Sequence, residues 1–285
     1  CPSPPSSGMA PAALRFLNHL ARRVRAAVAP VPDIGAELWL QTLGRHPFLA
    51  ALPLQDQAKL RALSALFLQR KEFSGAHGLV VTDAMAVAIA AQACLPLLHW
   101  GAPDKALAWY DDFVGIVVHP AEALARRKAV DEAGVVHHYH EVLLGEAMEH
   151  GPVMLSWPAV DGAGHHGATS VVIHEFMHKI DMRNGPADGC PPLPAGFLGQ
   201  AGARNAHAAW QAAWQPAYEQ FREQVIIAER FGGDWPWLDA YGATAPAEFF
   251  AVACEAYFVD RPRFAQEFPT LAPMLQAFFQ PALTG

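Results

Sequence analysis

Charged residues are scarce in this sequence. Asp, Glu, Lys and Arg make up 16% of its 285 residues, whereas hydrophobic residues make up 52%. A chain this apolar can fill a sizeable core, which excludes an intrinsically disordered protein. The formal net charge of −7 also argues against the basic face typical of nucleic-acid-binding proteins. We therefore expect no direct nucleic-acid partner.

Long apolar runs are also missing. The longest candidate, Ala84 to Leu98, is interrupted by Gln92 and Pro96 and falls short of the roughly 20 apolar residues that cross a bilayer as a helix. The first residues, CPSPPSSGMAPAAL, do not combine a charged region with an apolar stretch, as a secretory signal does. These features predict a cytoplasmic protein with no membrane partner.

Cysteine is rare as well. The chain has four, at positions 1, 94, 190 and 254, and none belongs to a CxxC pair. This argues against a zinc site built from cysteines and against a disulfide framework. Cys94 and Cys254 lie within apolar helical runs, where a free thiol behaves as a small core residue. A reducing compartment fits this usage best.

The remaining pattern predicts a helix-rich α+β fold with a small mixed sheet. Residues 1–12, rich in Pro and Ser, are expected to form a flexible tail, and residues 13–285 a single domain. Apolar spacing predicts helices at 14–29, 55–70, 82–98, 170–182, 207–231 and 247–258. Short apolar runs predict strands at 115–119, 135–142 and 152–157. The segment 186–202, rich in Pro and Gly, is expected to be a long surface loop, and 241–246 a shorter one.

The predicted helix at 170–182 contains the pattern HExxH, with histidines at 174 and 178 and a glutamate at 175. On a helix, positions i and i+4 lie about 40° apart around the axis and about 6 Å along it. The imidazoles of His174 and His178 can therefore reach one metal ion, and Glu175 lies beside them. This is the spacing of zinc proteases, in which the glutamate acts as general base.

A catalytic zinc needs a third protein ligand and one open position. The extended pattern HExxHxxGxxH is excluded, because its glycine position is Asp181 and its last histidine position is Asn184. A distant carboxylate is the remaining source of a ligand. The downstream candidates are the glutamates at 219, 223, 229, 248, 255 and 267.

Glu248 is the preferred third ligand. It begins an otherwise apolar helix and shares one face with Glu255, seven residues later. A buried carboxylate without a partner is costly, and a zinc ion would compensate Glu248. Glu255 then fits behind a ligand histidine. The alternative is that Glu248 only stabilises its helix N-terminus, since Pro246 lies at the start.

Five stretches resemble a known family. They are TDAM at 82–85, AAQACLPLL at 90–98, GPVMLSW at 151–157, VIHEFMHKIDMRNG at 172–185 and YGATAPAEFFA at 241–251. With them the sequence resembles, from about residue 40 to 280, the Mlc titration factor A family of bacterial zinc peptidases, whose catalytic part is similar to that of anthrax lethal factor. The two stretches at 172–185 and 241–251 are the most specific.

The resemblance implies a zincin-like (gluzincin) catalytic core with one Zn²⁺ per chain and aminopeptidase activity on peptides. It implies zinc ligands at His174, His178 and Glu248, the base Glu175, and Tyr241 as a group that stabilises the transition state. Two departures stand out. Val252, one turn after Glu248, takes the place of the acidic residue that orients a ligand in thermolysin-like enzymes. Gly242 is expected to loosen the loop that carries Tyr241.

Other readings stay open. The resemblance also implies a regulatory protein that sequesters a transcriptional repressor, with proteolysis secondary. A zinc-stabilised structural protein is disfavoured, because structural zinc normally has four protein ligands. The strand at 153–157 is expected to be a sheet edge that aligns an extended peptide. The remaining clustered histidines, which we expect in exposed polar segments, are His137, His138, His140, His165 and His166.

Overall fold

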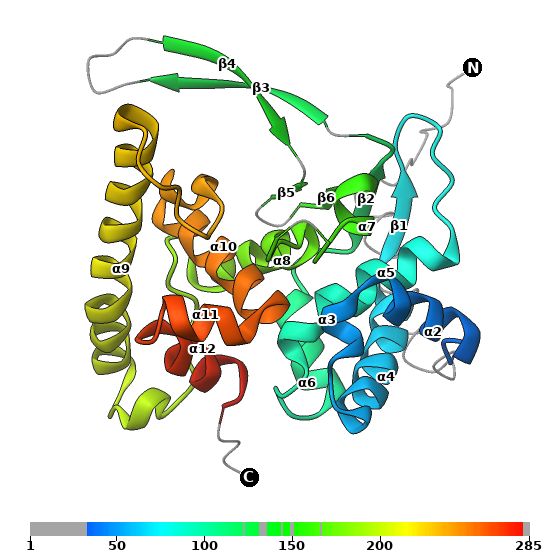
Figure 1. The fold of residues 1–285 in the computed structure, drawn as a ribbon. Coiled ribbons are helices and arrows are strands. Elements are labelled where there is room, and N and C mark those ends of the chain that lie inside the picture. The colour runs from blue at the N-terminus through cyan, green and yellow to red at the C-terminus, as the bar shows by residue number, and fades with distance from the viewer. Residues whose placement is uncertain are drawn as a thin grey trace, which may run out of the picture.

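The computed structural model describes residues 33–121, 123–130, 136–143, 145–148, 151–165 and 167–281. The tail predicted at 1–12 and the helix predicted at 14–29 lie outside the described residues. Apart from a central sheet and a hairpin, the described chain is mainly helical (Figure 1). A helix-rich α+β fold is therefore confirmed.

The N-terminal part is a group of helices. They are α2 (Ala36–Arg45), α3 (Pro47–Ala50), α4 (Leu54–Arg70), α5 (Asp83–Cys94) and α6 (Pro103–Leu107). Helices α4 and α5 confirm two predicted helices. The hydroxyl of Thr82 accepts a hydrogen bond from the Met85 amide and caps α5. Because Pro96 has no amide hydrogen to continue the helix, α5 gives way at Leu95 to a short 3₁₀ turn, η1 (Leu95–Leu97).

A small mixed sheet, as predicted, lies beside these helices. Its strands are β1 (Glu72–Gly75), β2 (Gly115–His119), β6 (Val153–Ser156) and β5 (Gly145–Ala147), in that spatial order. The first three are parallel, and β5 pairs antiparallel with β6. The prediction that 153–157 is an edge strand was wrong, because β6 has a neighbour on each side. The edge strands are β1 and β5, and the three residues of β5, GEA, show no apolar alternation that would predict a strand.

A separate hairpin connects β2 to β5. It consists of β3 (Ala123–Val130) and β4 (Val136–Leu143), which pair antiparallel from Ala123 with Leu143 to Val130 with Val136. Strand β4 confirms the strand predicted at 135–142. Figure 1 shows the hairpin extending away from the rest of the described chain.

The C-terminal part contains the short α7 (Trp157–Asp161) and a second group of helices. They are α8 (Val171–Asp181), α9 (Ala203–Phe231), α10 (Pro246–Val259), α11 (Arg261–Glu267) and α12 (Leu271–Phe279). Figure 1 shows α8 in the middle of the molecule, close to the sheet, with α10 beside it and α9 at the outer side. Helices α8, α9 and α10 confirm the three helices predicted in this part of the chain.

One continuous apolar core joins both groups of helices. In α10, buried apolar side chains surround its axis on nearly all sides, so this helix runs through the core instead of along its surface. Trp210 and Trp214 of α9 stack with their ring centroids 4.8 Å apart and contact Phe250 of α10. Cys94 and Cys254 are buried free thiols, as predicted. Within the described residues, no helix combines the length and the apolar character needed to cross a bilayer.

Candidate metal centre and active site

Helix α8 presents the HExxH residues. Its N-terminus is fixed by Ser170, whose hydroxyl accepts a hydrogen bond from the Ile173 amide at 3.2 Å. The apolar residues of the motif, such as Phe176 and Met177, are fully buried. His174 and His178 lie one turn apart on the same helix, and their side chains are only 10% and 12% exposed.

Three side chains converge at this point. Nε2 of His174 lies 3.0 Å from Oε2 of Glu248, Nε2 of His178 lies 3.1 Å from the same oxygen, and the two nitrogens are 3.2 Å apart. Ligand atoms held tetrahedrally around zinc at about 2.1 Å lie about 3.4 Å from one another. The observed triangle is close to that size. The residues therefore fit a zinc ion with one position left for another ligand.

In the neutral form that would bind a metal, His174 keeps Nε2 free. Its Nδ1 lies 2.7 Å from Oε1 of Glu255, so the ring donates its Nδ1 proton there and leaves a lone pair on Nε2. That lone pair faces a carboxylate oxygen of Glu248 and the second imidazole nitrogen of His178. Without a metal, burial lowers the pKa of the His174 ring, but the contacts with Glu248 and Glu255 outweigh it and raise the pKa well above the usual value. The site therefore attracts positive charge, which a bound cation would supply.

Glu255 supplies the acidic partner that position 252 lacks. Its Oε1 holds His174, and its Oε2 accepts a hydrogen bond from the Ser170 amide at 2.6 Å. The loss of an orienting carboxylate inferred from Val252 is thus compensated two helical turns after Glu248. The placement of Glu255 behind a ligand histidine matches the expectation from its seven-residue spacing.

A buried polar chain continues behind Glu255. The hydroxyl of Ser170 donates to Oε1 of Gln92 at 2.8 Å, and the amide nitrogen of Gln92 lies 3.4 Å from Nε2 of His46. Gln92 and His46 are fully buried. Gln92 is the polar residue that interrupts the apolar run of α5. Its side chain binds Ser170, which in turn binds Glu255, the partner of His174.

Glu175 is 5% exposed and lies next to His174 on α8. Burial raises the pKa of its carboxyl group to about 7; the two histidines oppose the shift, and Glu248 and Glu255 add to it. A carboxyl group with a pKa near neutrality can both accept and return a proton. For Glu248, burial favours the neutral form, but the contacts with His174 and His178 outweigh it and hold its pKa well below the usual range.

Tyr241 lies beside the same histidines. It belongs to the 3₁₀ helix η5 (Ala240–Ala243), and its ring centroid is 5.9 Å from that of His174. The loosening expected from Gly242 stays a prediction. Gly242 is buried, and a Cβ atom there would lie 3.3 Å from Phe221 and 3.4 Å from Val252, so glycine permits close packing of η5 against α9 and α10.

The segment predicted as a surface loop at 186–202 also supports the site. Cys190 and Phe197 are buried, so the surface prediction was wrong for the middle of this segment. The Gly189 amide donates to Asp181 at the end of α8. A Cβ atom at Gly189 would lie 2.6 Å from the Pro246 carbonyl oxygen. The segment thus packs between α8 and the start of α10, where Glu248 lies.

The other clustered histidines do not join this site within the described residues. His165 is exposed, and its Nε2 lies 2.7 Å from the Arg45 carbonyl oxygen. This agrees with the exposed position expected for it. His166 and the side chains of His137, His138 and His140 lie outside what the structure describes.

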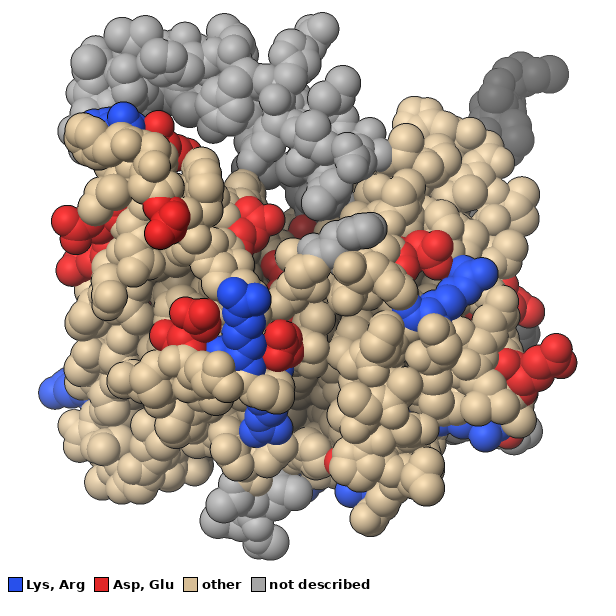
Figure 2. Space-filling view, in the orientation of Figure 1, with Lys and Arg blue, Asp and Glu red and all other residues tan. Residues whose placement is uncertain are grey.

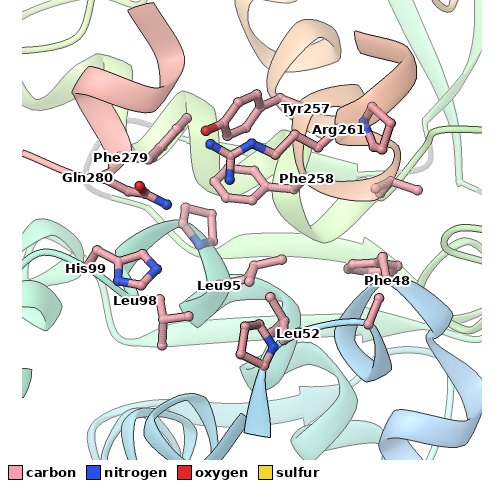
Figure 3. A pocket seen from close by; sticks show the side chains of 15 residues that line it. Phe48, Leu52, Leu95, Leu98, His99, Tyr257, Phe258, Arg261, Phe279 and Gln280 are labelled. Carbon is pink, nitrogen blue, oxygen red and sulfur yellow. The ribbon is translucent and has the colours of Figure 1, made fainter. Parts of the chain in front are cut away.

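The face shown in Figure 2 carries no continuous basic patch: Lys and Arg are scattered there among acidic residues. A cavity of about 250 Å³ lies elsewhere, between η1 and the helices α10 to α12 (Figure 3). None of the residues that line it belongs to the histidine and glutamate cluster. The cavity is therefore separate from the metal centre.

Known proteins are similar to this chain in sequence. The family described as glucose-regulated metallo-peptidase M90 matches residues 19–280. Mlc titration factor A of Cronobacter sakazakii is 33% identical over 247 residues, which are 86% of this chain and 84% of that protein. The Mlc titration factor A proteins of Salmonella arizonae and Klebsiella pneumoniae are each 32% identical, over 85% of this chain and 90% and 85% of their own lengths.

Proposed function

Since the chain belongs to the glucose-regulated metallo-peptidase M90 family, we propose that it is a zinc-dependent aminopeptidase with a zincin-like catalytic core. His174, His178 and Glu248 hold the zinc, Glu175 is the general base and Tyr241 assists the transition state. The observation that carries this proposal is the triangle of two imidazole nitrogens and one carboxylate oxygen, 3.0–3.2 Å apart, beside the buried carboxyl group of Glu175.

The residues divide the chemistry among them. The bound metal would polarise the scissile carbonyl and acidify a water molecule. Glu175 accepts the proton of the attacking water and later returns it to the leaving amine. Tyr241 lies near enough to His174 to donate a hydrogen bond to the developing oxyanion. Glu255 keeps His174 in the tautomer that exposes Nε2.

The substrate would align on β5. This strand pairs with β6 on one side only, and no strand of the described chain pairs with its other edge. Strand β5 also lies against α8. An extended peptide could add to the free edge by main-chain hydrogen bonds, which brings one of its peptide bonds toward the metal centre.

Metal content and hydrolysis, measured together on wild type and Glu248→Ala, test this proposal. We expect one zinc per chain and hydrolysis of chromogenic amino-acid amides in wild type, with both lost in the variant. Hydrolysis of free but not N-acetylated substrates would support the aminopeptidase assignment. A wild-type protein with neither zinc nor activity would disprove the metal site itself.

A second candidate function comes from the name of the relatives, titration factor for Mlc. In this alternative the chain binds a transcriptional repressor, and proteolysis is secondary. A zinc-loaded wild type that cleaves no peptide would favour it. The direct measurement is whether Glu175→Gln still relieves repression, since this exchange should stop hydrolysis without altering the outer surface.

A further inference from the structure

Lys179 follows His178 directly on α8 and is completely buried. Its ammonium group donates three hydrogen bonds: to Oδ2 of Asp112 at 3.0 Å, to the Met148 carbonyl at 2.5 Å and to the Gly151 carbonyl at 3.0 Å. An ammonium group has three protons and accepts nothing. Every donor of this buried lysine is therefore used.

Two of these acceptors, Met148 and Gly151, lie between β5 and β6. The Gly151 amide also donates to the Met148 carbonyl at 3.0 Å, and a Cβ atom at Gly151 would lie 2.7 Å from Cβ of Met148. These two residues thus lie close together where Lys179 binds them. Since β5 ends at Ala147, the lysine holds the end of the free edge strand.

We propose that Lys179 is a positioning residue that fixes β5 at a set distance from the metal centre and so favours extended peptides over single-residue amides. The inference rests on the proposed peptidase function. Lys179 points away from the histidines, because consecutive residues of a helix differ by about 100° around the axis. Its effect on substrate is therefore transmitted through Met148 and Gly151 and not by contact.

A lysine at position 179 supports a role in positioning β5. Asp112 precedes β2, so one side chain joins α8 to two strands of the sheet. A buried ion pair is weak evidence for stability, because apolar residues of similar size often serve as well. An apolar residue, however, could not satisfy the carbonyls of Met148 and Gly151, and these would move toward other donors and carry β5 with them.

The experiment uses the full chain loaded with zinc and compares Lys179→Met with the exposed control Lys59→Met. Because the single exchange leaves the partly buried Asp112 with the more distant Arg183, 3.9 Å away, as its ion-pair partner, Lys179→Met/Asp112→Asn serves as the variant that removes both charges of the pair. Zinc content is measured for each protein. Values of kcat and KM are measured for an extended peptide and for an amino-acid amide, and hydrogen exchange is followed in segments 145–156 and 246–259.

We expect zinc content to stay at the wild-type level, and KM for the extended peptide to rise about tenfold as the carbonyls of Met148 and Gly151 lose their donors. The kcat for that peptide and both constants for the amide should change little. Exchange in 145–156 should become at least about tenfold faster, while 246–259 stays protected. Equal losses for both substrates, or an unchanged KM for the peptide, would overturn the proposal.

Failure of the proposed function would look different. If the wild-type protein binds zinc but hydrolyses neither substrate, the peptidase assignment fails and hydrogen exchange alone decides about Lys179. Faster exchange in 145–156 at full zinc content would still support its hold on β5. Unchanged exchange there would refute that hold, whatever the enzymatic activity.

Discussion

Two buried polar clusters lie on the same helix, α8, and they differ in how their hydrogen bonds are satisfied. Around Lys179, three donors meet three acceptors. Around His174, His178 and Glu248, two imidazole nitrogens and a carboxylate oxygen face one another at 3.0–3.2 Å, and the raised pKa of His174 shows that the cluster attracts positive charge. The ammonium group of the first cluster has all its donors used, whereas the second cluster attracts a cation.

This difference distinguishes a structural polar cluster from a candidate ligand site better than burial does. Both clusters are buried, both join α8 to distant parts of the chain, and both contain ionisable groups. Buried polar groups of folded proteins are normally paired, so a cluster of nitrogen and oxygen atoms that attracts positive charge is a candidate place for a metal ion. A substitution in the Lys179 cluster should change stability or substrate placement, whereas a substitution around His174, His178 and Glu248 should change zinc binding or hydrolysis.

The largest effect is expected from Glu175→Gln. This exchange keeps the size of the side chain and removes its ability to accept a proton, so kcat should fall by about 10³-fold, with zinc content unchanged. Metal analysis and steady-state kinetics on the same preparation check this result. Retention of full activity would show that another group accepts the proton.

The next effect concerns the support of the metal cluster. Glu255→Gln removes the charge that holds His174 but keeps an oxygen for it, so zinc affinity should fall by about 10- to 100-fold. Competition with a chromogenic chelator measures the affinity. Glu267→Gln, at an exposed carboxylate that lies 3.7 Å from Arg263, is the matched control. An equal affinity in both variants would mean that Glu255 does not support the ligand.

The metal cluster could be predicted from the sequence because much of it is local. His174, Glu175 and His178 lie within five residues of one helix, and helix geometry alone brings the two imidazoles together. Glu248 is distant, but it stood out as a carboxylate in an apolar helix. The structure places it between the two imidazoles, and Glu255 was recognised by the same contrast of charge and apolar surroundings.

The Lys179 cluster could not be predicted in this way. Its acceptors are Asp112 and two backbone carbonyls, and a sequence does not show which carbonyl a lysine will reach. Strand β5 was missed for a related reason: three residues are too few for a periodic pattern, and its pairing with β6 depends on tertiary packing. The one available signal was Lys179 itself, a charge flanked by residues of a buried helix.

A smaller effect is expected at the edge of the lysine cluster. Lys71 donates to the carbonyls of Tyr110 and Phe113, and its nitrogen lies 3.7 Å from the Phe113 ring centroid. Burial lowers its pKa to about 8, Asp112 and Asp111 oppose the shift, and Lys179 adds to it. Between pH 8 and 10.5 the unfolded chain keeps a proton that the folded chain releases, so the free energy of unfolding rises with pH.

Comparison with Lys71→Met isolates this contribution. Relative to the variant, wild type should gain about 2 kcal/mol from pH 8 to pH 10.5, a value reduced from the full shift because Lys71 is partly exposed. Below pH 8 the lysine is charged in both states, and the difference should be constant. Urea denaturation at several pH values measures it. A constant difference across the whole range would show that Lys71 keeps its ordinary pKa.

The smallest effect is expected at Tyr257, which is buried on α10 and lines the cavity of Figure 3. Its hydroxyl has no hydrogen-bond partner among the described residues, whereas the atoms of the metal cluster face other polar side chains. Removing an unpaired buried hydroxyl relieves its desolvation, so Tyr257→Phe should stabilise the fold by at most about 1 kcal/mol.

Thermal unfolding measures this change, with Tyr110→Phe as the contrasting variant, because the Tyr110 hydroxyl donates to the Ala93 carbonyl. Tyr110→Phe should destabilise by about 1 kcal/mol. If both variants destabilised the fold equally, the Tyr257 hydroxyl would have a partner in the folded protein. A ligand site would then be indicated only where several polar atoms converge, as they do around His174, His178 and Glu248.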